Sequence, residues 1–316
     1  MRTEERGELA YIRWIRSRLA GGDRRVTIGP GDDMAEVLVP LLDKGQDRAR
    51  VLIGTDTILD GVHFDLGRDR LEDVGWKAVA VNLSDVAAMA GEPLAAVGAV
   101  ALPRSFGMAE AQRLFEGMSR CAEVYDTAWV GGDVTAWEHP LAVTVTVLAQ
   151  AEHPVRRSGA RPGQWIGVTG ALGGSLLGKH LTFSPRVREA RRLAEAVSLG
   201  AMMDLSDGLS SDVRHIGEES GCGAIIEGAR IPIAEAAREL AARDGRGPLD
   251  HALNDGEDFE LLFTVDEADA ERLAGLDVGV PVTVIGRTVE SSRGILMVDE
   301  EGREQPLQRG GYEHWR

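Results

Sequence analysis

The first half of the chain alternates between stretches with helical spacing and stretches with strand-like spacing of apolar residues. Apolar residues recur every three or four positions in three stretches, which predicts helices near residues 7–20, 71–90 and 108–125. Short apolar or alternating runs predict strands near residues 51–54, 95–101, 128–130 and 141–149. Helices and strands in this order are typical of a mixed α/β domain.

A change of composition near residue 150 predicts a domain boundary. The apolar run LAVTVTVLAQ ends there and is followed by AEHPVRRSGARPGQ, a polar stretch that contains prolines and glycines. The mixed pattern then resumes, with strands predicted near residues 165–169, 223–227, 259–265, 281–286 and 294–298. We therefore expect a two-domain α/β protein of mixed α+β type, with domains over residues 1–150 and 151–316.

The length and apolar content suit two globular domains. The chain has 316 residues, 43% of them hydrophobic, and no apolar run approaches the ~20 residues that a membrane span needs. The start, MRTEERGELAYIRWIRSRLA, is charged throughout and lacks the apolar segment of a secretory signal. The two cysteines, Cys121 and Cys222, are too few for a disulfide framework and are expected to be core residues. We expect a cytoplasmic protein with no membrane partner.

The charge balance restricts the possible ligands. With 51 acidic and 35 basic residues, the formal net charge is −16, which disfavours nucleic acid as a partner. The lysines are Lys44, Lys77 and Lys179, so most basic residues are arginines. A polyanionic ligand would therefore depend on arginine, backbone amides and metal cations.

Four apolar or small-residue runs end in an aspartate. Asp56 closes VLIGTD, Asp85 closes AVNLSD, Asp133 closes AWVGGD and Asp204 closes GAMMD. A carboxylate in a buried element is costly unless a cation or several hydrogen-bond donors meet it. Four such positions indicate one shared magnesium cluster that serves phosphate chemistry.

The segment LEDVGWKAVAVNLSDVAAMAG, residues 71–91, is apolar or small around nearly its whole circumference and predicts a buried helix. Asn82 and Asp85 lie about one turn apart on it. A metal or a buried set of hydrogen bonds should meet Asp85. Helix capping or a buried ion pair is the alternative for this residue.

Two glycine-rich segments place carboxylates in flexible backbone. GPGDDMAEV has glycines and a proline before Asp32 and Asp33, and VGGD ends at Asp133 after a short predicted strand. Glycines let the main chain approach a phosphate while the aspartate faces a cation. A solvated turn and a plain hairpin are the respective alternatives.

The stretch MDLSDGLSSDVRHI predicts the start of a helix, because Leu209, Val213 and Ile216 form a helical stripe. Ser206 is the expected N-cap, and helix starts attract anions. A cap alone is the alternative, although it does not require a carboxylate at Asp204. Further along, LNDGEDFELLF is expected to point at least one carboxylate into a cleft, with a solvated turn as the alternative.

The segment GGSLLGK, residues 173–179, has the glycine and lysine spacing of a P-loop. His180 stands where a hydroxyl should hold magnesium, and the loop contains the bulky pair Leu176 and Leu177. We therefore expect a strand-to-helix turn whose glycines allow close packing.

In order, the segments GPGDD, GTDTILDGVHF, WKAVAVNLSDVAAMAGEP, VGGDVT, RRSGARPGQWIGVTG, MDLSDGLSSD and LNDGEDFELLF resemble the thiamine-monophosphate kinase family. Its superfamily also contains aminoimidazole ribonucleotide synthetase. The resemblance runs from about residue 7 to 316. It implies ATP-dependent phosphorylation of thiamine monophosphate to thiamine diphosphate, with several Mg²⁺ ions, on a homodimer formed through the N-terminal domain.

The resemblance also implies roles for individual residues. Magnesium positions correspond to Asp33, Thr55, Asp56, Asp85, Asp133, Asp204 and Asp207. Nucleotide positions correspond to Gly132, Asp133, Arg157 and Ser206, and the thiamine phosphate side corresponds to His63, Glu257 and Trp315. Among these, Asp33, Asp85, Asp133 and Asp204 are the expected catalytic residues.

Two positions depart from the family pattern: Gly54 stands where a serine often precedes the TDT segment, and Val134 replaces a threonine. Any side-chain oxygen ligand at these positions is lost. Two other functions remain open, an ATP-dependent synthetase of the same superfamily and a non-catalytic regulator that binds nucleotide and metal. The complete set of aspartates argues against the regulator.

Overall fold

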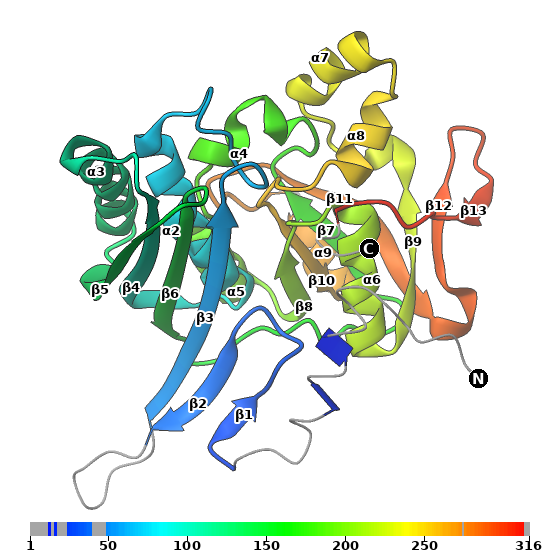
Figure 1. Ribbon diagram of the computed structural model, residues 1–316. Coiled ribbons are helices and arrows are strands. Elements are labelled where there is room, and N and C mark those ends of the chain that lie inside the picture. Colours follow the sequence, from blue (N-terminus) through cyan, green and yellow to red (C-terminus); the bar gives the residue numbers. More distant parts are fainter. Residues whose placement is uncertain (1–11, 14–15, 18–23, 40–48, 274, 313–316) are drawn as a thin grey trace, which may run out of the picture.

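Two mixed β-sheets with helices packed against them form the framework of the protein (Figure 1). The computed structural model describes residues 12–13, 16–17, 24–39, 49–273 and 275–312. Most of the helix expected over residues 7–20 lies outside the described residues.

The first sheet has the strand order β1-β2-β3-β6-β4-β5. Its strands are β1 (Val26–Ile28), β2 (Ala35–Val39), β3 (Ala49–Leu59), β4 (Glu92–Pro103), β5 (Ala128–Trp137) and β6 (Ala142–Gln150). Neighbours are antiparallel except for β4 and β5, which are parallel. The strands expected at 51–54 and 128–130 are both longer than predicted, because polar and glycine residues continue the pairing.

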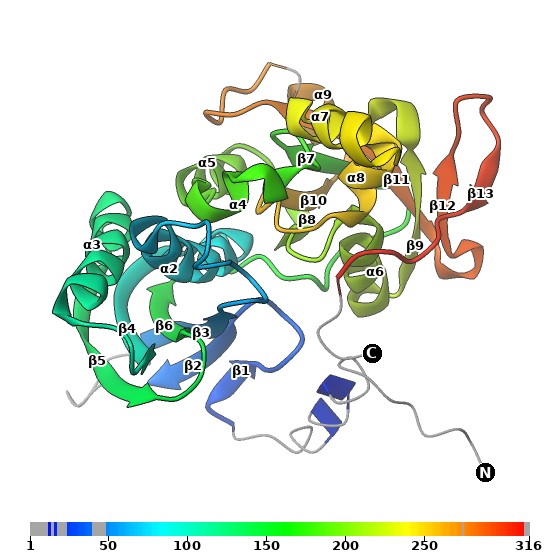
Figure 2. The ribbon, with the colours of Figure 1, turned by 45° about the horizontal axis from the view of Figure 1, so that its top comes forward.

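Helices α2 (Leu71–Ala88) and α3 (Met108–Val124) cover one face of this sheet (Figure 2). The two helices approach closely at a pair of glycines. A Cβ atom on Gly75 would stand 2.1 Å from the carbonyl oxygen of Leu114, and one on Gly117 would stand 1.9 Å from that of Glu72. Only glycine permits this contact between the helix backbones.

The second sheet has the order β13-β12-β9-β11-β7-β10-β8. Its strands are β7 (Trp165–Thr169), β8 (Leu199–Asp204), β9 (Cys222–Glu227), β10 (Leu261–Val265), β11 (Val282–Glu290), β12 (Ile295–Val298) and β13 (Glu304–Pro306). All neighbours are antiparallel except β12 and β9. The sequence pattern did not predict β8, because a short apolar run fits a helix and a strand equally well.

Six helices accompany the second sheet: α4 (Lys179–Thr182), α5 (Val187–Ala196), α6 (Leu209–Ser220), α7 (Glu235–Asp244), α8 (Pro248–Asn254) and α9 (Glu267–Leu273). Side chains of β10 alternate between two cores. Leu261 and Phe263 join the core that contains α2 and the first sheet, whereas Leu262 joins the core beneath α6. Helix α2 also contacts α4, α5 and β8, so it lies between the two sheets.

Both cysteines are buried and unpaired, as expected for core residues. Within the described ranges no helix combines the length and apolarity that crossing a bilayer requires.

Candidate active site in an acidic cleft

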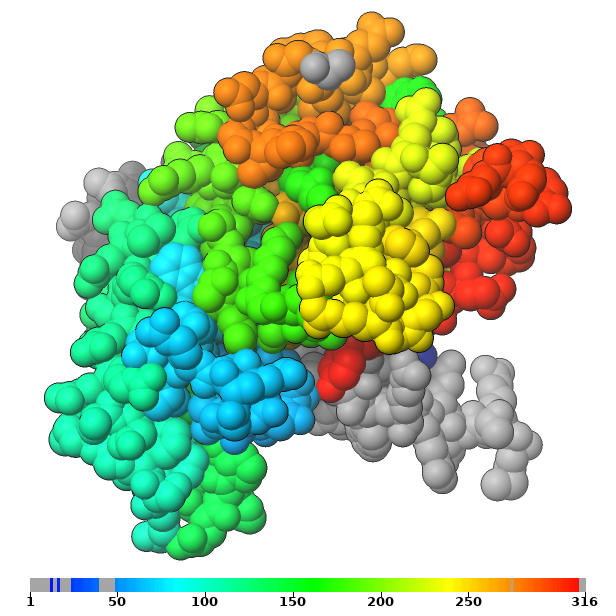
Figure 3. Space-filling view, turned by 90° about the horizontal axis from the view of Figure 1, so that it is seen from above, coloured from blue at the N-terminus to red at the C-terminus, as the bar shows by residue number. Residues whose placement is uncertain are grey.

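A cleft of about 350 Å³ is lined by residues of both halves of the chain. Its acidic lining residues are Asp56, Asp85, Asp204, Asp207, Asp255 and Glu257. Seen from above, the segment after β3 (blue) lies near those around α4 (green) and α7 and α8 (yellow), with the last described residues (red) between them (Figure 3). Strand β3 and helix α2 therefore form one side of the cleft, and β8 and the loops of the second half form the other.

Three carboxylates from distant segments meet at the cleft, which two of them, Asp85 and Asp204, line. One oxygen each of Asp33, Asp85 and Asp204 lies within 4.8 Å of the others. Asp33 lies in the turn before β2, Asp85 on α2, and Asp204 is the last residue of β8. Of the four run-ending aspartates that were expected to share one cluster, Asp85 and Asp204 meet here together with Asp33, and Asp56 lines the same cleft. Asp133 lines a separate groove, so the expectation is wrong for that residue.

Burial disfavours the ionised form of the carboxylates in this cluster. Desolvation raises the pKa of Asp85 well above the usual range, and the nearby carboxylates of Asp56 and Asp204 raise it further. The described residues provide Asp85 with no hydrogen bond to its carboxylate. About one turn away on α2, Asn82 Oδ1 accepts a hydrogen bond from the backbone N–H of Asp56 at 3.1 Å. A divalent cation is the partner that would compensate such a group, so the donor set fits a metal ion that prefers oxygen ligands.

Arg157, in the segment between the two sheets, holds the turn that carries Asp33. Its Nη2 and Nε atoms donate to the two oxygens of Asp33 at 2.8 and 3.1 Å, and its backbone N–H donates to Asp32 Oδ1 at 2.7 Å. Burial opposes the charge of Arg157, but the Asp33 carboxylate outweighs this and raises its pKa. The pair fixes one wall of the cluster and places a guanidinium beside it.

Ser84 connects α2 to the second half of the chain. Its hydroxyl donates to Asp204 Oδ2 at 2.6 Å. Burial, with the Asp33 charge as the next cause, nevertheless raises the pKa of Asp204 to about 7.

We predict that metal-free protein becomes less stable as the pH rises from about 4 to about 7. Within this interval folded Asp204 keeps a proton that the unfolded chain, with an ordinary aspartate pKa, releases, so folding is disfavoured as the pH rises. Thermal unfolding without metal should show a midpoint several degrees lower at neutral than at mildly acidic pH. Magnesium should restore the midpoint at neutral pH.

The matched variant for this prediction is Asp204→Asn, which cannot ionise. Its unfolding midpoint should depend less on pH than that of the wild type. An unchanged pH dependence would contradict the assignment of the raised pKa to Asp204.

A second group of interactions lies at the other end of the cleft. Lys77 of α2 is fully buried, and its ammonium donates to both carboxylate oxygens of Glu257 at 2.7 and 2.8 Å and to the carbonyl oxygen of His63 at 2.7 Å. Burial lowers the pKa of Lys77, while Glu257 counteracts this. His63 Nδ1 accepts from the N–H of Leu59 at 3.0 Å. Glu257 has a φ of +53°, so the turn is held in a strained conformation by these contacts.

The resemblance implies that His63 and Glu257 lie on the same side of the site, and the structure brings them together through Lys77. The resemblance implies no role for Lys77. The signal that would have found it is a single lysine within an otherwise apolar helix, which requires a buried anionic partner.

The segment around Ser206 differs from the expectation. Helix α6 begins at Leu209 with Gly208 as its N-cap, so Ser206 is not the cap. Asp212 reaches back from the first turn, and its Oδ2 accepts from the N–H groups of Asp207 and Gly208 at 3.2 and 3.1 Å. The carboxylate of Asp212 thus replaces the serine hydroxyl, and Ser206 lines the cleft instead.

Several expected site residues lie apart from this cluster within the chain. Gly132 and Asp133 lie within β5, not after a short strand, and line a separate groove next to α3. Thr55 Oγ1 donates to the carbonyl oxygen of Val145 and accepts from Thr146 at 2.9 Å, on the sheet face opposite α2. Trp315 lies outside the described residues.

Gly54, the departure that precedes Thr55, does face the acidic cluster. A Cβ atom on it would stand 3.6 Å from Asp85 Oδ2. A serine hydroxyl at this position would therefore lie beside Asp85.

The amides and lysine of the P-loop-like segment are bound to internal carboxylates. The N–H of Gly173 donates to Asp258 at 2.9 Å, that of Gly174 to Asp255 at 3.2 Å, and Lys179 pairs with Glu260 at 3.0 Å. A Cβ on Gly173 would stand 2.6 Å from the backbone nitrogen of Ala252. The segment is the closely packed turn that the sequence predicted. It positions the loop of Asp255 and Glu257, both of which line the cleft as expected.

Family models match both halves of the chain. Residues 31–151 match the model described as AIR synthase related protein, N-terminal domain, and residues 153–299 match the model of the corresponding C-terminal domain. Together they cover most of the chain.

Curated relatives include the thiamine-monophosphate kinases of Rhodopirellula baltica and of Escherichia coli strain K12. The first is 42% identical over 90% of this chain and 89% of its own length, and the second is 33% identical over 98% of both chains. The solved structure of AaThiL complexed with AMPPCP and TMP superposes with a TM-score of 0.82 at 29% identity, covering 99% of each chain. The thiamine monophosphate kinase from Aquifex aeolicus superposes with a TM-score of 0.77, covering 97% of this chain and 100% of that one. E. coli HypE, at 20% identity and a TM-score of 0.70, shares the fold. The chain therefore belongs to the thiamine-monophosphate kinase family of AIR synthase related proteins.

Proposed function

We propose that the protein transfers a phosphoryl group from ATP to thiamine monophosphate and so forms thiamine diphosphate. The observation that carries this proposal is the meeting of Asp33, Asp85 and Asp204 beside a cleft that Asp85 and Asp204 line. Membership of the kinase family supports the choice of donor and acceptor.

We assign Mg²⁺ to the three carboxylates, with Asp56 beside them. Donor and acceptor are both polyanions, and bound Mg²⁺ would neutralise part of their charge and of the charge that develops on the transferred group. Asp33, Asp85 and Asp204 would hold the ions, while Arg157 keeps Asp33 in place. Ser206 lines the cleft between Asp204 and Asp207 and would face the nucleotide phosphates.

No general base is required for this reaction. The acceptor phosphate has a second pKa near ~6 and is mostly dianionic at neutral pH. The work of the chain is therefore to bind and align the two ligands and to exclude water.

The Lys77–Glu257 end of the cleft would receive the thiamine part of the acceptor. Thiamine carries a cationic thiazolium ring, and Glu257, which lines the cleft, offers a carboxylate to it. His63 lines the same end. Trp315 remains a predicted stacking partner.

Product analysis tests the proposal. Purified protein with ATP and Mg²⁺ should convert thiamine monophosphate to thiamine diphosphate and release ADP. A carbonyl-phosphorylating synthetase would give no thiamine diphosphate, and a regulator would consume no ATP when thiamine monophosphate is added. Either of these results would overturn the proposal.

We propose in addition that two copies pair through the uncovered face of the first sheet. On this face Ile53 of β3 and Leu148 of β6 form a cross-strand pair. Val97 of β4 pairs with Thr146 of β6 and lies diagonally opposite Leu148. These apolar side chains are exposed by about 38 to 40%. Contiguous exposed apolar surface marks an association site. Asp133 is exposed and pairs in register with the exposed Ala99 on β4, so a second copy is the means by which Asp133 would meet a ligand.

We predict that Leu148→Glu converts the dimer to a monomer. A carboxylate on this face would be desolvated without a partner when the copies pair. Light scattering after size-exclusion chromatography gives the mass. The control is Met108→Glu, a change at an exposed residue that begins α3. A wild-type monomer at micromolar concentration, or a Leu148→Glu dimer, would contradict the pairing face.

We retain a domain boundary near residue 150 and a cytoplasmic location as proposals. The chain passes from the first sheet to the second between Gln150 and Trp165, which supports the boundary.

A further inference from the structure

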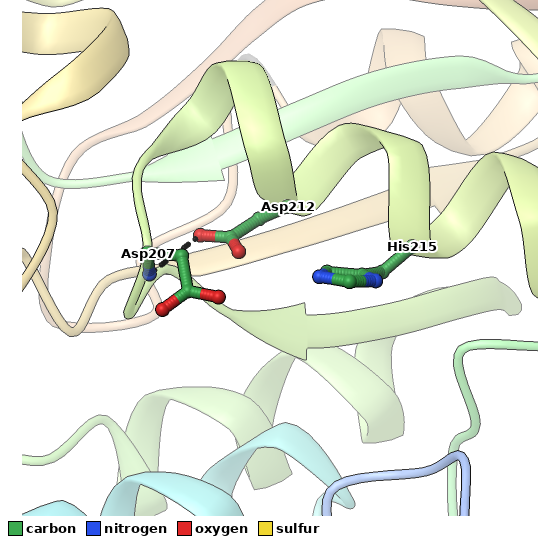
Figure 4. Close-up of side chains that lie close together, drawn as sticks. All are labelled: Asp207, Asp212 and His215. Atoms are coloured by element: carbon green, nitrogen blue, oxygen red, sulfur yellow. Dashed lines mark hydrogen bonds between the residues drawn. The ribbon is translucent and has the colours of Figure 1, made fainter. Parts of the chain in front are cut away.

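A second group of metal-ligating side chains lies next to the acidic cluster, on α6. One carboxylate oxygen each of Asp207 and Asp212 and one ring nitrogen of His215 lie within 4.8 Å of one another (Figure 4). Asp212 and His215 are three residues apart on one face of α6, and Asp207 lies in the loop before it. This group shares no residue with the cluster of Asp33, Asp85 and Asp204.

An unpartnered atom points into this group. Asp212 is fully buried, and among the described residues its Oδ1 has no hydrogen-bond partner. Its Oδ2 already accepts from two backbone N–H groups at the start of α6, so capping explains one oxygen and leaves the other. Figure 4 shows the second oxygen directed into the space between Asp207 and His215. A buried acceptor without a partner is costly, and it requires a ligand that the described part of the chain does not supply.

The charges favour a cation at this point. Burial raises the pKa of Asp212 well above the usual range, and the carboxylates of Asp207 and Asp204 add to this. Burial, together with the charges of Arg157 and Arg309, lowers the pKa of His215 to about 4, so the ring is neutral at pH 7 and keeps a lone pair. The negative charges of ionised Asp207 and Asp212 would balance the two positive charges of one divalent ion.

We propose that Asp212 and His215, together with Asp207, which the resemblance also counts among the magnesium positions, bind a divalent transition-metal ion of the Mn²⁺ to Zn²⁺ group at a point distinct from the carboxylates of Asp33, Asp85 and Asp204. An imidazole nitrogen distinguishes this donor set from one made of oxygens, because Mg²⁺ prefers oxygen ligands and binds imidazole poorly. Three ligands that each stand ~2.1 Å from one ion lie about 3–3.6 Å from one another, so side chains that are up to 4.8 Å apart would close by roughly 1–2 Å on binding. Asp207 also lines the cleft, so the ion would lie at its edge.

Equilibrium dialysis of Co²⁺ against the full-length protein tests this site without nucleotide. Millimolar Mg²⁺ is present to occupy the oxygen-only cluster. Wild-type protein should retain one Co²⁺ per chain, with an absorption spectrum that indicates nitrogen coordination. If wild-type protein retains no Co²⁺ under these conditions, the site does not exist.

Two variants then identify the ligands. His215→Gln removes the nitrogen, and Asp212→Asn keeps an amide oxygen for the N–H groups at the start of α6 while replacing the second oxygen with an NH₂ group. Each should weaken Co²⁺ retention at least about tenfold, a change of the size expected for losing a ligand. The matched control His153→Gln changes a histidine whose side chain is 92% exposed, and it should bind Co²⁺ as the wild type does.

Thermal unfolding without metal shows whether each variant is folded. A folded His215→Gln protein that retains Co²⁺ like the wild type would overturn the proposal. Because the experiment measures binding alone, its result is independent of whether the protein phosphorylates thiamine monophosphate.

Discussion

Asp85→Asn is expected to lower turnover at least about 100-fold at saturating Mg²⁺ and at the same time to stabilise the metal-free protein. Loss of one preorganised charge in an active site typically has an effect of this size. The stabilisation follows from the raised pKa of Asp85, because a group that burial keeps from ionising opposes folding at neutral pH. The neutral amide removes the repulsion from Asp56 and Asp204. A coupled ADP assay and calorimetry without metal measure the two effects.

The control for this prediction is Glu116→Gln on the exposed side of α3. It removes one negative charge far from the cleft and should change neither turnover nor the unfolding midpoint appreciably. Near wild-type turnover of Asp85→Asn would show that Asp85 does not bind the metal. An unchanged or lower metal-free midpoint would contradict the electrostatic account of the cluster.

Glu257→Gln is expected to cost about 3–5 kcal/mol of stability, because it leaves the buried Lys77 ammonium without its anionic partner. The carbonyl oxygen of His63 remains as its acceptor. The double variant Lys77→Met with Glu257→Gln removes both members of the pair and should recover much of the loss. A denaturant titration of the wild type, both single variants and the double variant gives the coupling energy of the pair.

Kinetics separate the two roles of this pair. Both Glu257→Gln and the double variant should raise KM for thiamine monophosphate more than KM for ATP, because both lose the carboxylate that faces the thiamine end. Recovery of stability without recovery of this KM would assign the carboxylate to substrate binding. The control is Glu72→Gln, which breaks an ion pair with Arg113 at the surface and should change stability little. Equal stability of Glu257→Gln and the wild type would contradict the importance of the buried pair.

The sequence predicted most of the secondary structure, because the helices and strands concerned have a clear period. Helix α2 was expected over residues 71–90 and spans Leu71–Ala88, and β7 was expected over 165–169 and spans Trp165–Thr169. The short strand β8 was missed because its apolar run has no period of its own. Its partner β10 supplies the pairing that makes it a strand. This pairing belongs to the tertiary structure and cannot be read from the apolar run itself.

The candidate site was predicted in part for a similar reason. Buried carboxylates stand out in an apolar sequence, so Asp85 and Asp204 were found from the residues alone. The sequence did not predict on which face of a sheet a side chain lies, as Thr55 shows. One residue along from a cleft-facing position on a strand, its hydroxyl points to the opposite side of the sheet. Similarly, the cap formed by Asp212 depends on a backbone turn that the sequence pattern does not specify.

Helix α2 contributes residues to both proposed ends of the cleft. Lys77 contacts Glu257 at the proposed thiamine end, and Asp85 joins the carboxylates at the proposed metal end. The separation of eight positions from Lys77 to Asp85 corresponds to a rise of about 12 Å along one rigid axis. Deleting a single residue from this interval would turn one end by about 100° relative to the other. The length of this interval therefore sets the distance between the two ends of the cleft, and we expect an insertion or deletion within it to abolish turnover.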